Sequence, residues 1–218
     1  MSDFVVTAHQ PNAFFAASII TKIQASDALI LLDEVQFTKN GWTNRNKLPN
    51  GNWLTVPVER HCAFKPINRV RIGEPAKDWR KPLIHALVDA WPGDVTAAVC
   101  REILRPYRLL VGLNVAILNI VLGELAPHVL WAFQSHLHGG HTVPAVSSDS
   151  DALKPISWQL ASMVEELGGT IYLSGPSGRK YLDEKPFEER GISVDYWAHE
   201  GDNPCSLSLI GQRVEVAA

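Results

Sequence analysis

The chain has 218 residues and a formal net charge of −3, and 46% of its residues are hydrophobic against 20% charged. This composition excludes disordered and fibrous proteins and predicts one globular domain over residues 1–218. The longest apolar stretch is broken by Gly112 and Asn114, and no basic segment with a hydrophobic core opens the chain, so neither a membrane span nor a secretory signal is expected. We therefore expect a cytoplasmic protein without a membrane partner.

The charges are unevenly distributed along the chain. Between Phe37 and Lys81, ten Lys or Arg residues stand against three acids, a local balance of +7, whereas the remaining chain carries −10. Clustered cations concentrate and steer anionic partners such as nucleic acids. A solvated charged surface is the alternative, and the acidic remainder argues against a protein that coats nucleic acid on every side.

The first part of the chain predicts a strand, a helix and a second strand. DFVVTA is short and β-branched, HQPNAF is a turn, AASIITKIQAS is helical, and Ala28 to Leu32 is a continuous apolar run. Such a run is typical of a central parallel strand, and it ends at Asp33, where a carboxyl end would present polar residues to a ligand.

The later elements complete the expected fold. NRNKL and WLTVPV flank Pro49-Asn50-Gly51 and predict a β-hairpin, and helical periodicity follows, with a helix near Leu104 to Leu125 inside a helical insertion at about 76–130. WQLASMVEELGG predicts a helix, TIYLS a strand, EKPFEER a helix and ISVDYWAH a last strand-like step. The expected class is α/β, a Rossmann-like and mainly parallel sheet with a helical insertion and a β-hairpin.

The turn after the first strand is the first candidate site. His9, Gln10 and Asn12 precede a helix, whose N-terminal amides can hold an anion while the side chains add donors. The alternative is that Pro11 occupies the first helical turn and His9 only caps it.

The second candidate follows the buried strand, where eight polar or aromatic residues occur within fifteen positions. Arg and Lys clamp phosphate, Asn can hydrogen-bond sugars or base edges, and Trp can stack on a ring. A polar hairpin tip is the alternative. The residues are Asp33, Gln36, Lys39, Trp42, Asn44, Arg45, Asn46 and Lys47.

The third candidate is the loop after the TIYLS strand. Hydroxyls, glycine-rich backbone and two cations within seven residues can cradle a phosphate or pyrophosphate, although the order of a Walker loop is absent and an ordinary tight turn is the alternative. Its residues are Ser174, Gly175, Ser177, Gly178, Arg179 and Lys180.

A histidine-rich loop contains His136, His138 and His141, but solvation explains it better than a metal, so no metal site is predicted. Its nearest carboxylate along the following chain is Asp149. The three cysteines are far apart, so neither a disulfide framework nor a thiolate zinc site is indicated, and no sequence signal pairs any of them with a base. Covalent catalysis is therefore unsupported.

Several motifs occur in an order that resembles the WbqC-like protein family. They are HQPN, KI-x-x-SD, LLDEVQF, GW-x-NRN, G-x-W-x-TVPV, LGG-x-IYLSG-x-SG-x-KYLD, F-x-x-x-GI-x-V and LSLI. The resemblance covers about residues 1–72 and 157–210. The turn at 13–17 and the sequence after Ile210 depart from the family's pattern, so contacts are not transferred from there.

The resemblance implies one of two substrate classes. Family members occur among bacterial surface-polysaccharide genes, which implies a nucleotide-sugar-modifying transferase or a non-enzymatic nucleotide-sugar binding protein. Similar phage proteins imply an amino-acid:DNA transferase for thymine hypermodification, working in the host cytoplasm. In that reaction an amine such as that of glycine displaces pyrophosphate from an activated hydroxymethylated pyrimidine in DNA.

The basic tract favours the DNA reaction, whose expected partners are DNA carrying the activated pyrimidine and a small amino acid. Arg45, Lys39, Arg179 and Lys180 would hold the pyrophosphate, with Arg45 the foremost leaving-group contact. Asp33 or His9 would accept the proton of the amine. No organic cofactor is expected, and Mg²⁺ is the one ion that could accompany the pyrophosphate.

Overall fold

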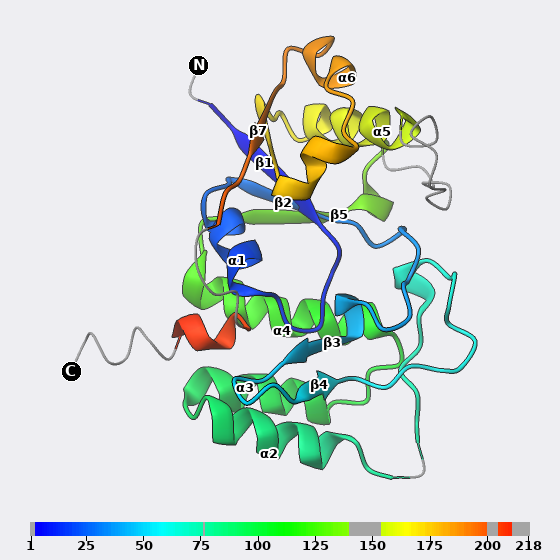
Figure 1. Ribbon diagram of the computed structural model, residues 1–218, viewed down its shortest axis with the longest axis vertical. Coiled ribbons are helices and arrows are strands. Elements are labelled where there is room, and N and C mark those ends of the chain that lie inside the picture. The colour runs from blue at the N-terminus through cyan, green and yellow to red at the C-terminus, as the bar shows by residue number, and fades with distance from the viewer. Residues whose placement is uncertain (1–2, 76, 140–153, 200–204, 211–218) are drawn as a thin grey trace, which may run out of the picture. The chain divides into compact units, whose positions relative to one another are not determined.

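The computed structural model describes residues 3–75, 77–139, 154–199 and 205–210 (Figure 1). The chain forms two compact units. Unit 1 consists of Met1–Gln10, Thr21–Val35 and His128–Gly201, and unit 2 of Pro11–Ile20, Gln36–Pro127 and Asp202–Ala218. Helix α1, Ala17–Gln24, contributes residues to both.

Unit 1 contains a five-stranded sheet in the order β5-β2-β1-β6-β7 (Figure 1). All four pairings are parallel, and β1 lies between β2 and β6. The first strand and the TIYLS strand are therefore neighbours in one sheet, which confirms the predicted α/β class with a mainly parallel sheet. The strands are β1 Val5–His9, β2 Ala28–Leu31, β5 Leu130–Phe133, β6 Ile171–Ser174 and β7 Ser193–Tyr196.

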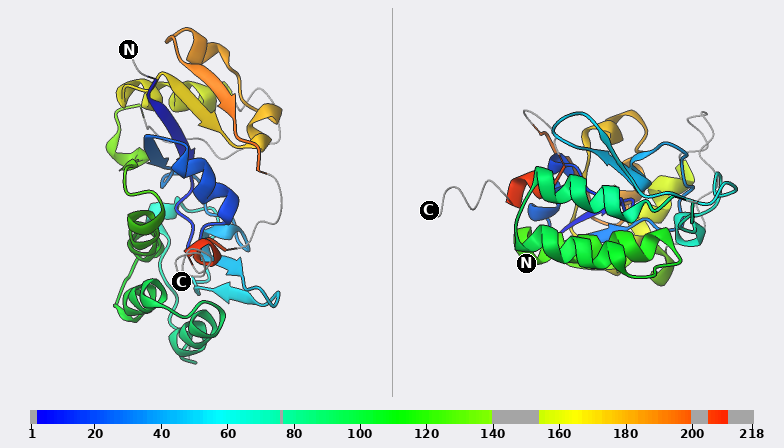
Figure 2. Two further views of the ribbon diagram at one scale, coloured as in Figure 1. Left: turned by 90° about the vertical axis from the view of Figure 1, so that its left-hand side faces the viewer. Right: turned by 90° about the horizontal axis from the view of Figure 1, so that it is seen from below.

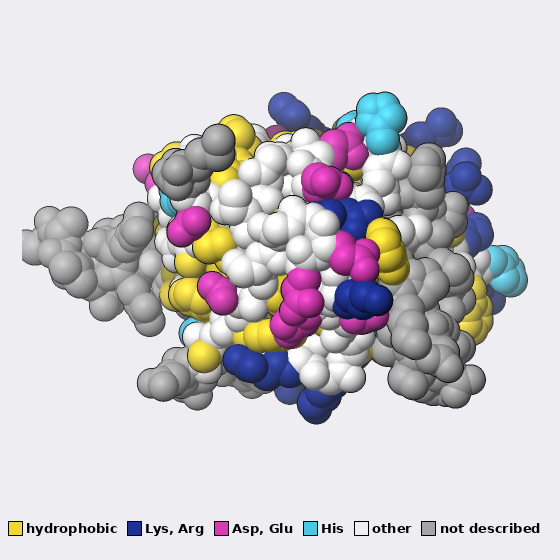
Figure 3. All heavy atoms as spheres, turned by 90° about the horizontal axis from the view of Figure 1, so that it is seen from above, with side chains coloured by type: hydrophobic (Ala, Val, Ile, Leu, Met, Phe, Trp, Pro, Cys, Tyr) yellow, Lys and Arg dark blue, Asp and Glu magenta, His cyan; other side chains and the backbone are white. Residues whose placement is uncertain are grey.

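One face of this sheet is buried by α5, Lys154–Glu166, and α6, Lys185–Glu188. Val6 and Ile30 from the strands pack with Val164 and Phe187 from the two helices, and all four are fully buried. Each such side chain contributes about 1.5–3 kcal/mol to folding. The helical face seen in Figure 3 carries acidic and basic side chains side by side, so its charge is mixed.

The end of α5 depends on a pair of glycines. Gly168 has a φ of +76°, the left-handed conformation that commonly ends a helix, and a Cβ on Gly169 would lie 2.7 Å from Val6 Cγ2. The chain can therefore turn directly from α5 into β6, which delivers the loop after β6 to the carboxyl edge of the sheet.

Unit 2 contains the predicted hairpin and the helices of the central part of the chain (Figure 2). Strands β3, Arg45–Lys47, and β4, Trp53–Thr55, pair antiparallel, with Asn46 opposite Leu54. Helix α3 packs against both other helices. These helices are α2 Arg80–Ala90, α3 Asp94–Leu104 and α4 Leu110–Leu125.

Two details of the sequence prediction are wrong. The helix expected from Leu104 to Leu125 begins only at Leu110, because Pro106 follows an extended Arg105 and separates α4 from α3. Strand β5 was not predicted. It is an edge strand with Leu130 67% exposed, and its apolar run follows closely after the apolar helix α4, so the sequence pattern predicts a helical insertion that extends to about residue 130.

Candidate functional site

The carboxyl edge of the sheet in unit 1 is the candidate site. The chain leaves β1 toward β2 and β5 on one side, and later returns to add β6 and β7 on the other side. In open parallel sheets, ligands bind at the carboxyl ends of strands where the order reverses in this way. His9 ends β1 and Ser174 ends the adjacent β6, so the reversal lies between these two residues.

His9 is half-buried at this point. Its Nδ1 lies 2.8 Å from the carbonyl oxygen of Gln10, which can only accept, so Nδ1 carries the proton and Nε2 the lone pair. Burial, together with the nearby Lys22, lowers the pKa of His9 to about 4. The imidazole is therefore neutral at physiological pH, and its acceptor nitrogen is Nε2.

Lys22 is a residue that sequence reasoning missed. Its side chain, from α1, is 5% exposed, and Nζ donates to the carbonyl oxygen of Ala8 at 3.2 Å. Burial lowers the pKa of Lys22 to about 8. In the described part of the chain no ion pair joins Lys22 to an acid, so a buried ammonium lies next to His9 without a counter-charge. Nothing in the sequence indicates that Lys22 is buried, because a lysine in an amphipathic helix is usually exposed and only the tertiary packing buries this one.

Asp33 follows β2 and is 3% exposed. Ser135 donates to both carboxylate oxygens, from its backbone N–H at 3.0 Å and from Oγ at 2.7 Å. The carboxylate therefore ties the end of β2 to the segment after β5. Its predicted role as the proton acceptor stays a prediction.

The loop after β6 is a tight turn around Ser174. Residues Pro176–Lys180 form a 3-10 helix, and the Gly178 amide donates to the Gly175 carbonyl at 2.9 Å. A Cβ on Gly178 would lie 2.1 Å from Ser174 Oγ, so a larger residue there would force the Ser174 side chain to move. Ser177, Arg179 and Lys180 are exposed on this turn. The turn thus presents a hydroxyl and two cations at the carboxyl end of β6.

A cavity of about 550 Å³ opens beside this turn, lined in part by Arg179, Glu184, Asp195, Tyr196 and Trp197. The Arg179 guanidinium lies 4.2 Å above the Tyr196 ring, and the Tyr196 hydroxyl donates to Glu184 at 2.5 Å. Burial and this carboxylate raise the pKa of Tyr196 to about 12. The lining therefore combines a cation, acids and aromatic rings, which suits a polar ligand with hydroxyl groups.

Apart from Gln10, which is in unit 1, the remaining predicted site residues belong to unit 2, where buried asparagines join backbone segments. Asn44 donates to the Val56 carbonyl at 2.8 Å, and Asn46 donates to the Phe14 carbonyl at 2.7 Å. Asn114, which was not predicted, donates to the Pro11 and Thr43 carbonyls at 2.6 and 2.8 Å. These amides hold the turn after Pro11 against the hairpin and α4, a structural task that the polar pattern alone did not reveal.

The other members of this group lie on or near the hairpin. Arg45 donates to the Asn40 carbonyl, and its guanidinium lies 4.0 Å above the Trp53 ring. Trp42 is 53% exposed and Lys39 is exposed. The predicted contact between Arg45 and a leaving group stays a prediction. Unit 2 also contains Asn12, which is 3% exposed, and Gln36, which forms an isolated antiparallel β-bridge with Pro66.

A family model, described as the WbqC-like protein family, matches residues 10–204. The chain belongs to this family. The chain is also 31% identical to Rv1507c of Mycobacterium tuberculosis, described as an uncharacterized protein, over 179 residues that span 80% of this chain and 74% of that protein. No solved structure matches the chain significantly.

The match to the WbqC-like family spans almost all of the candidate site. It includes Lys22, Asp33 and the whole turn after β6, and it begins at Gln10, directly after His9. Helix α1, strands β2 and β6 and the turn after β6 therefore lie within the matched region, whereas β1 precedes it.

The histidine-rich loop is only partly described. The His138 ring contacts Glu166 at 3.0 Å, His136 packs against Phe133, and His141 lies outside the described residues. Within the described ranges, no three His, Cys, Asp or Glu side chains gather where they could hold a metal ion. None of the helices described there has the length and apolar character required to cross a bilayer.

Proposed function

We propose that this WbqC-like protein is a transferase in which an amine displaces pyrophosphate from an activated hydroxymethylated pyrimidine in DNA, with a small amino acid such as glycine as the amine donor. The supporting observation is the buried Lys22 ammonium beside the neutral His9 at the reversal of strand order. A cation without a counter-charge favours an anionic ligand, and a neutral imidazole can accept a hydrogen bond from an amine.

The chemistry is a substitution at the methylene carbon of the pyrimidine. The amine nitrogen forms the new C–N bond, the C–O bond to pyrophosphate breaks, and pyrophosphate leaves with the electron pair. Cationic donors must neutralise the leaving oxygens, and we assign this to Lys22, Arg179 and Lys180 of unit 1. Removing or supplying Mg²⁺ tests whether the ion contributes to the same neutralisation.

The amine must reach the carbon as a free base and lose a proton after attack. His9 Nε2 is suited to accept a hydrogen bond from the amine and so orient its lone pair, because the ring stays neutral down to a pH of about 4. Asp33 accepts a hydrogen bond from Ser135 at the same edge of the sheet, and we propose that its carboxylate accepts the proton that the amine loses.

A nucleotide-sugar transferase is the second candidate, and the cavity beside β7 favours it. Glu184 and Asp195 can accept hydrogen bonds from sugar hydroxyls, and Tyr196 offers a ring beside Arg179. In this case the same cations at the sheet edge would hold a diphosphate. A protein that only binds the nucleotide sugar would use the same contacts without turnover.

The deciding experiment is mass spectrometry of nucleosides from pyrophosphorylated hydroxymethyluracil DNA after incubation with the protein, a mixture of amino acids and either Mg²⁺ or EDTA. A nucleoside heavier by an amino acid, formed together with free pyrophosphate, supports the DNA reaction. Unchanged DNA, together with a raised melting temperature in the presence of uridine or thymidine diphosphate sugars, rejects it in favour of the second candidate.

A further inference from the structure

Two tryptophans form an exposed aromatic surface on unit 2. Trp42 is 53% exposed and Trp53 is 43% exposed, and their ring centroids lie 5.6 Å apart at an interplanar angle of 45°. Trp53 belongs to β4, and Trp42 begins the 3-10 helix Trp42–Asn44 that directly precedes β3, so a short, hydrogen-bonded support holds both rings. Large apolar rings left in water at this density are typical of a binding surface.

Two cations lie over one of these rings. The Arg45 guanidinium is 4.0 Å and the Lys47 ammonium 5.2 Å from the centroid of Trp53. Within the described chain, no ion pair engages either of them, so both charges are available to an anionic partner. We call Trp42, Arg45, Lys47 and Trp53 the hairpin surface.

A comparable pair in unit 1 lacks this property. Arg190 lies 4.5 Å above Trp158, which is 45% exposed, but Arg190 also pairs with Glu165 at 3.1 Å. Glu165 compensates the positive charge of Arg190, whereas within the described residues no acid compensates the charges of Arg45 and Lys47. An exposed tryptophan with an arginine above it is therefore not by itself a binding surface for anions.

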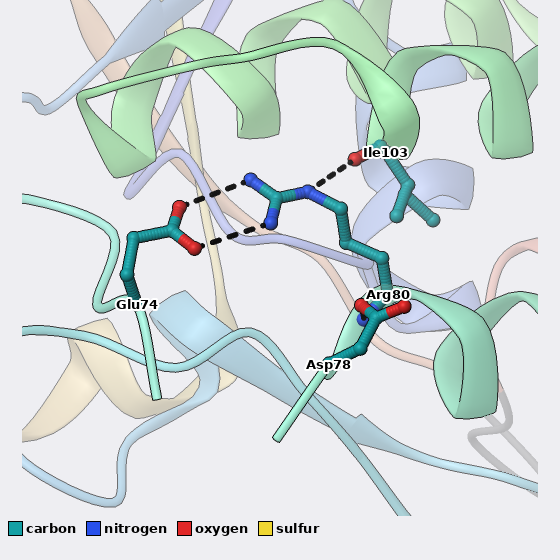
Figure 4. A network of polar contacts seen from close by, with 4 residues as sticks. All are labelled: Glu74, Asp78, Arg80 and Ile103. Atoms are coloured by element: carbon teal, nitrogen blue, oxygen red, sulfur yellow. Dashed lines mark hydrogen bonds and ion pairs between the residues drawn. The ribbon is translucent and has the colours of Figure 1, made fainter. Parts of the chain in front are cut away.

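The hairpin surface lies within the basic tract at residues 37–81. Some of the charged residues of this tract already contact one another, as the surroundings of Arg80 show. Arg80 pairs with Glu74 at 3.2 Å and donates to the Ile103 carbonyl, while its backbone N–H bonds Asp78 (Figure 4). Two of the three acids of the tract are thus engaged at the start of α2, away in sequence from the hairpin. Near the hairpin, Lys39, Arg45 and Lys47 take part in no ion pair within the described residues.

We infer that the hairpin surface binds single-stranded DNA by stacking an unpaired base on Trp42 and Trp53 while Arg45 and Lys47 contact flanking phosphates. The face of a base is accessible for stacking only in an unpaired strand, because each base in a duplex is covered by its neighbours. Proteins that bind single strands without sequence preference do so with aromatic rings and adjacent cations. This goes beyond the proposed function, since binding needs neither an amine nor an activated base.

The test is fluorescence anisotropy of a labelled, unmodified oligothymidine and of the matching duplex. We expect the single strand to bind more tightly than the duplex, and Trp53→Ala to weaken single-strand binding about 5- to 150-fold, as expected for the loss of stacking on one base. Trp53→Phe should restore most of the affinity, which separates stacking from a folding defect.

Two matched controls use other exposed aromatic residues. Trp158→Ala removes the neutralised pair in unit 1, and Phe64→Ala removes an 82% exposed ring within the basic tract of unit 2. Both should bind the single strand within threefold of the parent. Equal binding of duplex and single strand, or losses in the controls that match that of Trp53→Ala, would overturn the inference. Because the oligonucleotide carries no pyrophosphate, this outcome is independent of whether the transfer reaction occurs.

Discussion

The edge of the sheet in unit 1 and the hairpin surface in unit 2 both present cations, but in opposite environments. Lys22 is 5% exposed, whereas on the hairpin Lys47 is exposed and Arg45 is half-buried. A buried charge acts in a low dielectric and responds strongly to a nearby anion, while an exposed charge is screened by water and salt. The first environment suits the chemical step and the second suits holding a long anionic chain.

The largest expected effect is the loss of the buried cation. Lys22→Met keeps the length of the side chain but removes the charge, and turnover in the DNA transfer assay should fall about 100- to 1,000-fold, the range seen when one preorganised donor is removed from a transition state. Product is measured by nucleoside mass spectrometry. Lys185→Met, at an exposed lysine of α6 in the same unit, is the control and should retain full turnover.

The pH dependence of stability gives an independent measure of the same burial. Unfolding raises the pKa of Lys22 from about 8 to 10.5, so between these values the unfolded chain binds more protons and the free energy of unfolding rises with pH. The rise attributable to Lys22 is about 3 kcal/mol. Urea unfolding from pH 7.5 to 10.5 should show it as a difference between the parent and Lys22→Met. Parallel curves would show that the amine is not buried in solution.

Asp33→Ala should affect stability at the edge of the sheet. The substitution removes the acceptor of two hydrogen bonds from Ser135, and a hydrogen bond to a charged group contributes about 1.5–3 kcal/mol to stability. Urea unfolding at pH 7 measures the loss. Ser135→Ala removes only the Oγ bond and should cost less, so an equal or larger loss for Ser135→Ala would contradict the bidentate contact.

The smallest expected effect concerns Arg45 on the hairpin surface. Arg45→Ala removes one phosphate contact, so the slope of log affinity against log salt for single-stranded DNA should become shallower by about 0.7. Anisotropy titrations at several salt concentrations measure this slope, and an unchanged slope would remove Arg45 from the surface.

The sequence was sufficient for the elements with strong local patterns and insufficient where packing decides. Val5 to His9 is rich in β-branched residues, Ala28 to Leu31 is apolar, and turns follow both, so both strands and their parallel pairing could be predicted. The apolar run of β5 follows closely on that of α4, so the change from helix to strand was missed, and the break at Pro106 was overlooked within the apolar periodicity before α4.

The site shows the same limit more sharply. The polar segment that contains Asn44 and Asn46 is typical of a ligand site, yet their side-chain amides donate to backbone carbonyls. A lysine such as Lys22 in a helix is expected to be exposed to solvent, yet its side chain is buried and bonds the carbonyl of Ala8 near the end of β1. Which polar side chains face a ligand depends on long-range packing that periodicity does not encode.

The most direct test of the sheet edge as the reactive site is calorimetry of inorganic pyrophosphate binding at pH 8, in two buffers of different ionisation enthalpy. Pyrophosphate bound near Lys22 would raise the pKa of the amine, so the parent protein should take up protons on binding and Lys22→Met should neither bind comparably nor take them up. Equal affinity and equal proton uptake in parent and variant would contradict the assignment of this edge as the site of the leaving group.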